Sequence, residues 1–213
     1  MMKQNKVLIC LEAIFLSLYF SAFVFAQNPS GKCEIYSKET GAEFEDEEQV
    51  IGCPDAVTYS HRLYKFSVVL PANWSKIYHS KRKSEDHGKI VSIAFIPKED
   101  FSSGVYVAMF NIIMQKSKDK NIEKQAKENI NLSKTKVNGF KLESEVENTK
   151  IASLDAAKFI FSSNSTARTA RYIIYNGGFV YELNFACDSI DAYRKYLADF
   201  DKILQHITIE KQT

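Results

Sequence analysis

The fold of this 213-residue chain is decided by residues 171–187, RYIIYNGGFVYELNFAC. Both halves of this stretch are rich in aromatic and β-branched residues, which favour β-strands. Between the halves, Asn176 is followed by Gly177 and Gly178, and glycines adopt the positive φ angles of a two-residue turn without steric cost. The stretch therefore predicts a β-hairpin.

Strand patterns continue on both sides of this hairpin. In residues 63–71, LYKFSVVLP, the apolar side chains follow a period of two and Pro71 ends the run, which predicts a strand with one buried face. Residues 104–115, GVYVAMFNIIMQ, are apolar on both faces and predict a central strand covered on two sides. Further strands are predicted at about 90–96, 139–147 and 154–163.

Two segments have the period of a helix. In residues 119–132 an apolar residue recurs at every fourth position, at Ile122, Ala126 and Ile130, which predicts a surface helix with one narrow buried face. Near the C-terminus, Asp188 or Ser189 is placed to cap a second helix. Its predicted apolar stripe, broad enough to cover a sheet face, consists of Ile190, Tyr193, Leu197, Phe200, Leu204 and Ile207.

The order of these elements indicates the fold class. The strands follow one another without the regular strand–helix alternation of a parallel fold, so antiparallel pairing is expected. The sequence therefore predicts an α+β fold in which an antiparallel β-sheet is flanked by helices on both faces. Trp74, just past Pro71, is expected to be buried against the terminal helix at Tyr193, Leu197 and Phe200.

The N-terminus has the layout of a secretory signal peptide. Two lysines precede an apolar run, and Val24 and Ala26 occupy the −3 and −1 positions of a cleavage site before Gln27. The apolar run is shorter than the roughly 20 residues that cross a bilayer, although an uncleaved anchor is the alternative. We expect a signal peptide at 1–26, an N-terminal extension at 27–58 and a folded domain at 59–210, located outside the cytoplasm as a periplasmic or secreted protein.

Charge gives little indication of a partner. The chain has 28 Lys and Arg residues against 26 Asp and Glu residues. This balance gives no reason to expect a nucleic-acid partner, and it leaves peripheral membrane association and the oligomeric state open.

Three cysteines follow the predicted signal peptide. Cys33 and Cys53 are close in sequence in a loop-like region, so they are the natural disulfide pair in an oxidising compartment. Cys187 ends the predicted hairpin, where a single thiol is usually a small buried side chain. A reactive thiolate is disfavoured there because its sequence neighbours, Ala186 and Asp188, carry no positive charge.

The remaining candidate sites are weak. Residues 43–48 contain five acidic side chains, which predict a solvated loop; a divalent-cation site is the alternative, although the acid spacing and glycine of an EF-hand are missing. His79 and His87 flank a charged connection that is also expected to be solvated. The histidines lack zinc-ligand spacing and no nucleophile motif is present in the sequence. We therefore expect no catalytic residue, no metal ligand and no cofactor.

Arg168 and Arg171 are the remaining candidates for anion binding. They are three positions apart on a predicted strand, so they point to opposite faces and do not share a pocket. Tyrosines on the same strand could line a binding groove, but aromatic residues at strand spacing are more often part of the core.

The predicted strand, turn and helix segments carry a resemblance to a known family. YKFSVVLPANW at 64–74 resembles the F-x-(apolar)-x-x-P-x-x-W start of PsbP-type domains, and the predicted central strand, NIEKQAKENI helix, later strands, hairpin and terminal helix follow in matching order up to about residue 209. The resemblance implies a sheet with helices on both sides, which relatives use as an extrinsic subunit or assembly factor on photosynthetic membranes. The secretory N-terminus and the extension around 33–53 depart from that pattern, so no metal ligand is carried over.

The sequence thus favours an exported binding or assembly module, not an enzyme, that contacts another protein through a sheet edge or loop surface. The alternative is a carrier of an apolar or peptide-like ligand in a cleft between the sheet and a helix. A hydrolase without a recognisable motif is a third, weaker interpretation.

Overall fold

The computed structural model describes residues 34–36, 48–84, 88–103, 106–164 and 167–210. The predicted signal peptide at 1–26 therefore lies outside the described residues. Along the chain the elements are β1 (Glu34–Tyr36), β2 (Glu48–Gly52), β3 (Ala56–His61), β4 (Phe66–Pro71), β5 (Trp74–Ser84), β6 (Gly88–Pro97), α1 (Lys98–Ser103), β7 (Ala108–Lys116), α2 (Ile122–Lys136), β8 (Lys141–Leu142), β9 (Glu147–Ile151), β10 (Leu154–Ser163), β11 (Ala167–Asn176), β12 (Phe179–Cys187), α3 (Ile190–Gln205) and β13 (Ile207–Ile209).

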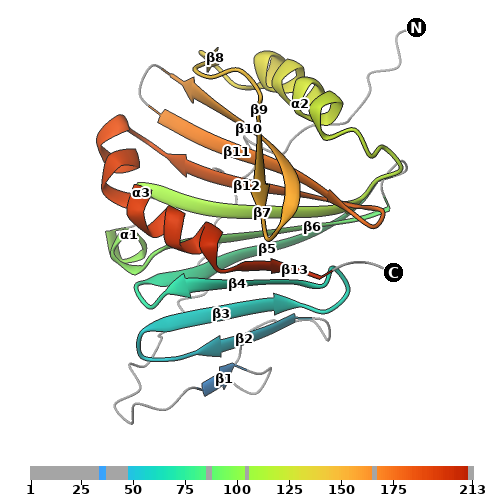
Figure 1. Ribbon diagram of the computed structural model, residues 1–213. Helices are drawn as coiled ribbons and strands as arrows, with labels where there is room; N and C mark the ends of the chain where they lie inside the picture. Colours follow the sequence, from blue (N-terminus) through green and yellow to red (C-terminus); the bar gives the residue numbers. More distant parts are fainter. Residues whose placement is uncertain (1–33, 37–47, 85–87, 104–105, 165–166, 211–213) are drawn as a thin grey trace, which may run out of the picture.

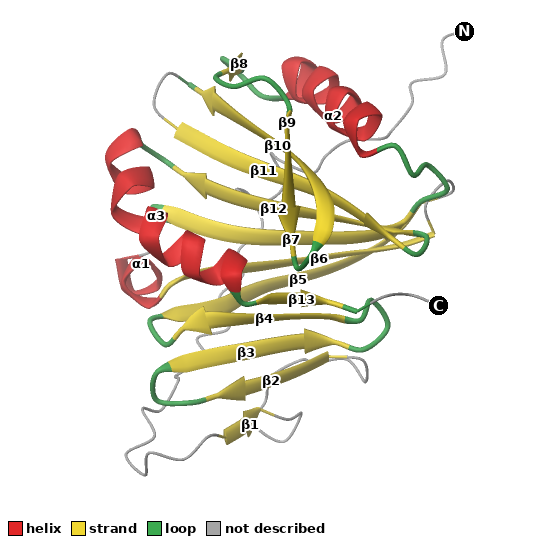
Figure 2. Cartoon of the chain, viewed as in Figure 1, coloured by secondary structure: helices red, strands yellow, loops and turns green. Residues whose placement is uncertain are grey.

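The strands form two antiparallel sheets (Figures 1 and 2). The smaller sheet has the order β1-β2-β3-β4-β13, and the larger sheet has the order β5-β6-β7-β12-β11-β10-β8, with β9 also paired to β10. The α+β class and the antiparallel pairing that the sequence predicted are confirmed.

The prediction of a single sheet was wrong. The chain leaves β4 at Pro71, turns at Ala72 and Asn73, and enters β5, which belongs to the other sheet. Proline donates no backbone hydrogen bond and favours a turn, so the sheet is interrupted there. At the far end of the chain, β13 returns to pair with β4, as Thr208 lies opposite Ser67. The smaller sheet is thus built from both ends of the described chain.

The predicted hairpin is confirmed. β11 and β12 pair antiparallel with Asn176 opposite Phe179. Gly177 and Gly178 have φ angles of 56° and 90°, in the left-handed region that glycine adopts freely. β12 then pairs with β7, which places the segment predicted to be central between β12 and β6.

The two sheets share an aromatic core, which also takes in α3. Tyr59 of the smaller sheet meets Phe95 of the larger sheet edge to face, with ring centres 5.6 Å apart. Phe185 of β12 stacks on Phe200 of α3 at 4.3 Å. All four side chains are at most 1% exposed. Such close-packed aromatic contacts hold the smaller sheet and α3 on the same face of the larger sheet.

A second core lies at the β10–β11 end of the larger sheet, under α2. Ala126 and Ile130 of the helix pack with buried side chains of the strands, namely Ala157, Phe159, Phe161, Ile173 and Val180. These are the helix positions that the sequence predicted to be buried. Asn121 caps the helix by accepting a hydrogen bond from the backbone N–H of Lys124, which satisfies one of the free donors of the first turn.

The terminal helix is confirmed, but its buried stripe is rotated from the predicted one. Its buried residues are Ala192, Tyr193, Tyr196, Phe200 and Ile203. Ile190 and Leu197, which the sequence placed in the core, are exposed by 42% and 39%. Ser189 caps the helix by accepting from the backbone N–H of Ala192.

The strand predicted at 139–147 is also different in the structure. Only Lys141 and Leu142 pair with β10, and the next strand, β9, begins at Glu147. The backbone N–H groups of Glu143 and Ser144 both donate to the Ile160 carbonyl, which bends the chain away from a continuous ladder. No helix within the described ranges is long and apolar enough to cross a membrane.

Candidate functional site

A row of buried polar side chains crosses the larger sheet on the α2 side. The strand registers place Asn111 of β7 opposite Asn184 of β12, and Asn184 opposite Arg171 of β11. Asn184 Nδ2 donates to Asn111 Oδ1 over 3.3 Å, and Asn111 Nδ2 donates to Ser92 Oγ over 3.0 Å. The three side chains on β7, β12 and β11 are 6–7% exposed. The row is therefore one hydrogen-bonded chain that runs perpendicular to the strands.

The positive charge of this row belongs to Arg171. Its guanidinium donates to Asn184 Oδ1 and to Asn129 Oδ1 of α2, and Asn129 Nδ2 donates to Glu182 Oε1 over 3.2 Å. Burial lowers the pKa of Arg171, while the charge of Glu182 raises it. The guanidinium also lies 5.4 Å from the centre of the Phe161 ring. These contacts spread the buried charge over amide oxygens and a ring face, and they attach α2 to the sheet.

Arg168 lies on the opposite face of β11, as predicted. Its Nε is 2.9 Å from Glu143 Oε2, and its guanidinium carbon is 4.7 Å from the centre of the Tyr193 ring in α3. Because Arg168 and Arg171 contact different layers, they do not form a common anion pocket. The sequence prediction on this point is confirmed.

Cys187 is a buried free thiol, which agrees with its interpretation as a small core side chain. Burial, together with the nearby carboxylates of Asp188 and Asp100, raises its pKa to about 12. The thiol is therefore protonated at neutral pH. A protonated thiol is a poor nucleophile.

Trp74 fixes α3 to the start of β5. The side chain is fully buried, its Nε1 donates to Asp199 Oδ2 over 3.1 Å, and its ring meets Tyr196 edge to face with centres 6.0 Å apart. The burial of Trp74 against the terminal helix was predicted correctly, but its ring and hydrogen-bond partners are Tyr196 and Asp199. Leu197, one of the expected partners, points outward.

α1 holds the same side of α3. The Tyr196 hydroxyl donates to Glu99, and Lys195 Nζ lies 2.7 Å from Glu99 Oε1. The hydrogen bonds from Lys195 and then Tyr196 lower the pKa of Glu99. Burial and the bond to Glu99 raise the pKa of Tyr196 to about 12. Because the tyrosine ring and its hydroxyl both have fixed partners, α3 is rotated toward α1, and this rotation explains why the predicted stripe was displaced.

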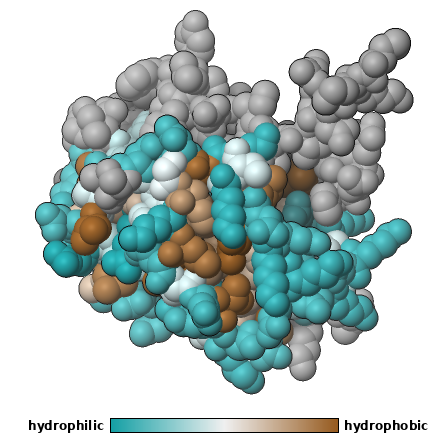
Figure 3. All heavy atoms as spheres, turned by 90° about the horizontal axis from the view of Figure 1, so that it is seen from above, coloured by the Kyte–Doolittle hydropathy of each residue, from teal (hydrophilic) through white to brown (hydrophobic). Residues whose placement is uncertain are grey.

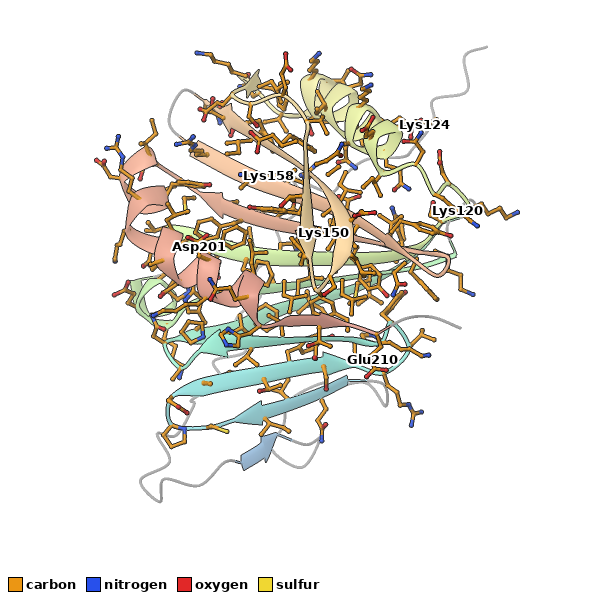
Figure 4. All side chains as sticks on the ribbon, viewed as in Figure 1. Lys120, Lys124, Lys150, Lys158, Asp201 and Glu210 are labelled. Carbon is orange, nitrogen blue, oxygen red and sulfur yellow. The ribbon has the colours of Figure 1, made fainter. Side chains whose placement is uncertain are left out.

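The rotation leaves an apolar and charged surface on the outer side of α3. We define the α3 outer surface as Ile190, Arg194, Leu197, Ala198, Asp201 and Gln205, all of them exposed. Ile190 and Leu197 are seven positions apart, as are Arg194 and Asp201, so each pair projects in nearly the same direction. Figure 4 shows Asp201 on this helix. No pattern in the sequence indicated this surface, because its leucine and isoleucine fit the core stripe equally well.

Several residues predicted for a disulfide or a cation site are not among the described residues. These are Cys33, residues 43–47 and His87. Glu48 begins β2, and His79 lies in β5. Among the described residues, no group of three His, Cys, Asp or Glu side chains could hold a metal ion. The cation site in the acidic run and the disulfide thus remain predictions.

The lysines labelled in Figure 4 include three with carboxylate partners. Lys124 Nζ lies 2.8 Å from Asp119, Lys158 Nζ lies 3.5 Å from Glu147, and Lys150 Nζ lies 3.8 Å from Asp155. These pairs balance the local charge. They are too exposed to add much stability or to form a concentrated positive site.

A depression of about 520 Å³ lies at the C-terminal end of α2, lined by Lys134, Thr135, Lys136, Val137, Asn138, Gly139 and Phe140. Most of these residues are polar. Seen from above, this end of the molecule is largely hydrophilic, with a strip of apolar surface near its centre (Figure 3). Half-buried Phe140, Leu142 and Val146 pack against the core beneath α2. The depression itself does not suit an apolar ligand.

Comparison with known proteins identifies the fold. No protein-family model matches the sequence, and no curated protein matches it. The solution structure of cyanobacterial PsbP from Synechocystis sp. PCC 6803 is similar at a TM-score of 0.54 and 12% identity, over 75% of this chain and 95% of that chain. The chain therefore has a PsbP-like fold, as the sequence resemblance implied. At this identity the similarity concerns the fold alone.

Two further structures are more distant. A crystal structure from Bacteroides thetaiotaomicron VPI-5482 is similar at a TM-score of 0.44 and 16% identity, over 70% of this chain and 46% of that chain. LpqN of Mycobacterium tuberculosis, described as involved in cell envelope biogenesis, is similar at a TM-score of 0.43 and 15% identity, over 68% of this chain and 82% of that chain. The chain thus spans less than half of the Bacteroides protein, and neither similarity bears on function.

Proposed function

We propose that this protein is an exported, non-enzymatic binding or assembly module that contacts another protein through the α3 outer surface. The observation that carries the proposal is the exposure of Ile190 and Leu197, by 42% and 39%, on one side of a helix whose other side is fixed in the core. Single exposed apolar residues are common on proteins, but two at seven-residue spacing on a rigid helix form a surface to which another helix or sheet can bind.

The polar groups of the structure support a binding role over a catalytic one. Arg171, Asn184 and Asn129 are hydrogen-bonded to one another inside the protein. Cys187 is held protonated. These groups stabilise the scaffold, and a rigid scaffold presents the α3 outer surface with little loss of conformational entropy on binding. The alternative of an apolar-ligand carrier has less support, because the depression at the end of α2 is mainly polar.

The experiment compares Leu197→Asp with Leu132→Asp. Leu132 lies on α2, and it is 41% exposed, so it is a matched control for Leu197 at 39%. Each protein is incubated with the envelope fraction or culture fluid of its host, and the bound proteins are compared by quantitative mass spectrometry. We expect a defined protein that binds the wild type and the Leu132→Asp variant and is lost with Leu197→Asp. If the same proteins bind all three, the α3 outer surface is not the contact.

Export is part of the proposal and has its own test. The intact mass of the protein recovered from outside the cytoplasm should correspond to a chain that begins at Gln27, because Val24 and Ala26 fit the cleavage positions. A mass that retains residues 1–26 would show an uncleaved anchor and a membrane-tethered protein.

A further inference from the structure

The charges on the α3 outer surface are arranged so that the surface complements itself. Arg194 and Asp201 have opposite charges and lie at nearly equal distances on either side of Leu197 and Ala198. When one such helix is turned end to end and laid against another, the arginine of each copy meets the aspartate of the other. An isologous contact of this kind has a two-fold axis, which here would pass close to Leu197 and Ala198.

We propose that a second copy of this chain docks on the α3 outer surface, with the two α3 helices antiparallel and with reciprocal Arg194–Asp201 ion pairs. This inference rests on the proposed function and names its partner. In that register Leu197 of one copy packs against Ala198 of the other, and the small alanine allows the helices to approach closely. Ile190 lies opposite Gln205 at each end of the contact.

The neighbouring charges fit the same arrangement. Asp191 and Lys202 lie on one rim of the exposed helix face, and both are exposed. In an antiparallel pair related by a two-fold axis, the same rims of the two helices lie side by side, so the Asp191 of each copy approaches the Lys202 of the other. The 3.3 Å Arg194–Asp191 pair within one copy competes only weakly, because its side chains are 75% and 93% exposed and an ion pair so open to solvent contributes little.

The size of the surface predicts a weak dimer. α3 has 16 residues, which corresponds to a length of about 24 Å. A contact along one helix of this length is smaller than the roughly 1,200 Å² of a standard stable interface. Self-association is therefore expected to depend on concentration, and it should weaken as salt screens the ion pairs.

The test reverses the charge at Arg194 or at Asp201. Sedimentation equilibrium of the exported protein is measured for the wild type, Arg194→Glu, Asp201→Arg, and an equimolar mixture of the two variants. Each variant alone should self-associate at least about tenfold more weakly than the wild type, because both attractive pairs become repulsive. The mixture should recover association, because the new glutamate of one variant then meets the new arginine of the other, and the unchanged Asp201 of the first meets the unchanged Arg194 of the second. Leu132→Asp serves as the control and should associate like the wild type.

The outcomes separate this inference from the proposed function. If the wild type is a monomer up to high concentration, or if the mixture does not recover association, the antiparallel dimer is wrong. If, in that case, Leu197→Asp still loses a different captured protein, the proposed function remains and the partner is that protein. If neither self-association nor a captured protein responds to Leu197→Asp, both proposals are wrong.

Discussion

At the scale of the residue, Trp74 shows how one side chain orients an entire helix. Its ring fills the space beside Tyr196, and its indole N–H has a carboxylate acceptor in Asp199. The apolar body and the polar tip are thus both satisfied inside the protein, which is the condition for burying tryptophan without an energetic penalty.

Replacement of Trp74 by alanine should destabilise the protein by about 3 to 5 kcal/mol, through lost transfer free energy and the cavity that remains. Trp74→Phe keeps part of the packing but loses the bond to Asp199, so a smaller cost of about 1 to 3 kcal/mol is expected. The measurement is urea unfolding, with the exposed Leu132→Ala as a control that should change little. A loss below about 1 kcal/mol for Trp74→Ala would contradict the anchoring role.

Several buried groups make the stability sensitive to alkaline pH, because burial raises the pKa of Tyr172 and Tyr193 as well as that of Cys187 and Tyr196. The pKa of Cys187 is raised from 9.0 to about 12, and the pKa of Tyr196 is raised from 10.0 to about 12. Both groups therefore release their protons at lower pH in the unfolded chain than in the folded protein. Their contribution to stability is fully present below about pH 9, the ordinary pKa of the thiol, and it is lost as the pH rises towards 12.

We expect the free energy of unfolding to fall between about pH 9 and 12, by up to about 1.4 kcal/mol per pH unit for each group that titrates only in the unfolded chain. Cys187→Ala should flatten the first part of this fall, because the unfolded variant has no thiol to ionise. Urea unfolding at several pH values in this range tests the prediction. An identical pH dependence in Cys187→Ala and the wild type would show that the folded thiol has an ordinary pKa.

At the scale of the element, the turn after α2 depends on a glycine. Gly139 has a φ angle of 67°, and a Cβ atom there would lie 2.9 Å from the backbone nitrogen of Asn164. That nitrogen donates to the Asn138 carbonyl, so the turn after α2 is hydrogen-bonded to the end of β10. A side chain at position 139 would separate two backbone segments that are in contact.

Gly139→Ala should therefore cost more stability than Gly178→Ala. Gly178 also has a positive φ, of 90°, but its added Cβ would meet no atom within 4 Å. The Gly178 variant should lose about 1 to 3 kcal/mol through backbone strain alone, and the Gly139 variant should lose at least about 1 kcal/mol more. Denaturant unfolding of both variants gives the comparison, and equal losses would show that the turn can move away from Asn164.

At the scale of the whole molecule, both ends of the described chain belong to the smaller sheet, with β1 at one edge and β13 at the other. Asn176, the last residue of β11 in the larger sheet, donates to the Glu210 carbonyl over 2.7 Å, and the Glu210 N–H donates to the Lys65 carbonyl over 3.0 Å. Figure 4 shows Glu210 at the end of β13 beside the smaller sheet. The C-terminal segment thus joins the two sheets.

The N-terminal end of the smaller sheet should be closed by a disulfide between Cys33 and Cys53. Glu34 lies opposite Gly52 in the β1–β2 pair, and these are the residues next to the two cysteines. Non-reducing peptide mapping should find the link, and its reduction should lower stability by roughly 3 kcal/mol. Cys33 or Cys53 joined to Cys187 would contradict this pairing.

The local sequence was sufficient to predict those turns, helix faces and strands that depend only on neighbouring residues. The Asn176–Gly177–Gly178 turn, the α2 positions Ala126 and Ile130, and strand 154–163 were predicted correctly, because turn chemistry and periodicity act over a few residues. The same local patterns placed Arg168 and Arg171 on opposite faces of β11.

Tertiary structure decided how the elements are arranged and which of their faces are buried. Pro71 and Trp74 are adjacent to one turn, yet the two sides of that turn belong to different sheets, because β4 pairs with β3 and with the distant β13, whereas β5 pairs with β6. Likewise, the row from Arg171 to Asn111 forms because three strands align in register, and Leu197 is exposed because Tyr196 has partners in α1 and β5. The sequence by itself determined the strands, helices and turns, since these depend on neighbouring residues. Sheet membership, helix rotation and the α3 outer surface depend on contacts between residues far apart in the chain, which periodicity does not encode.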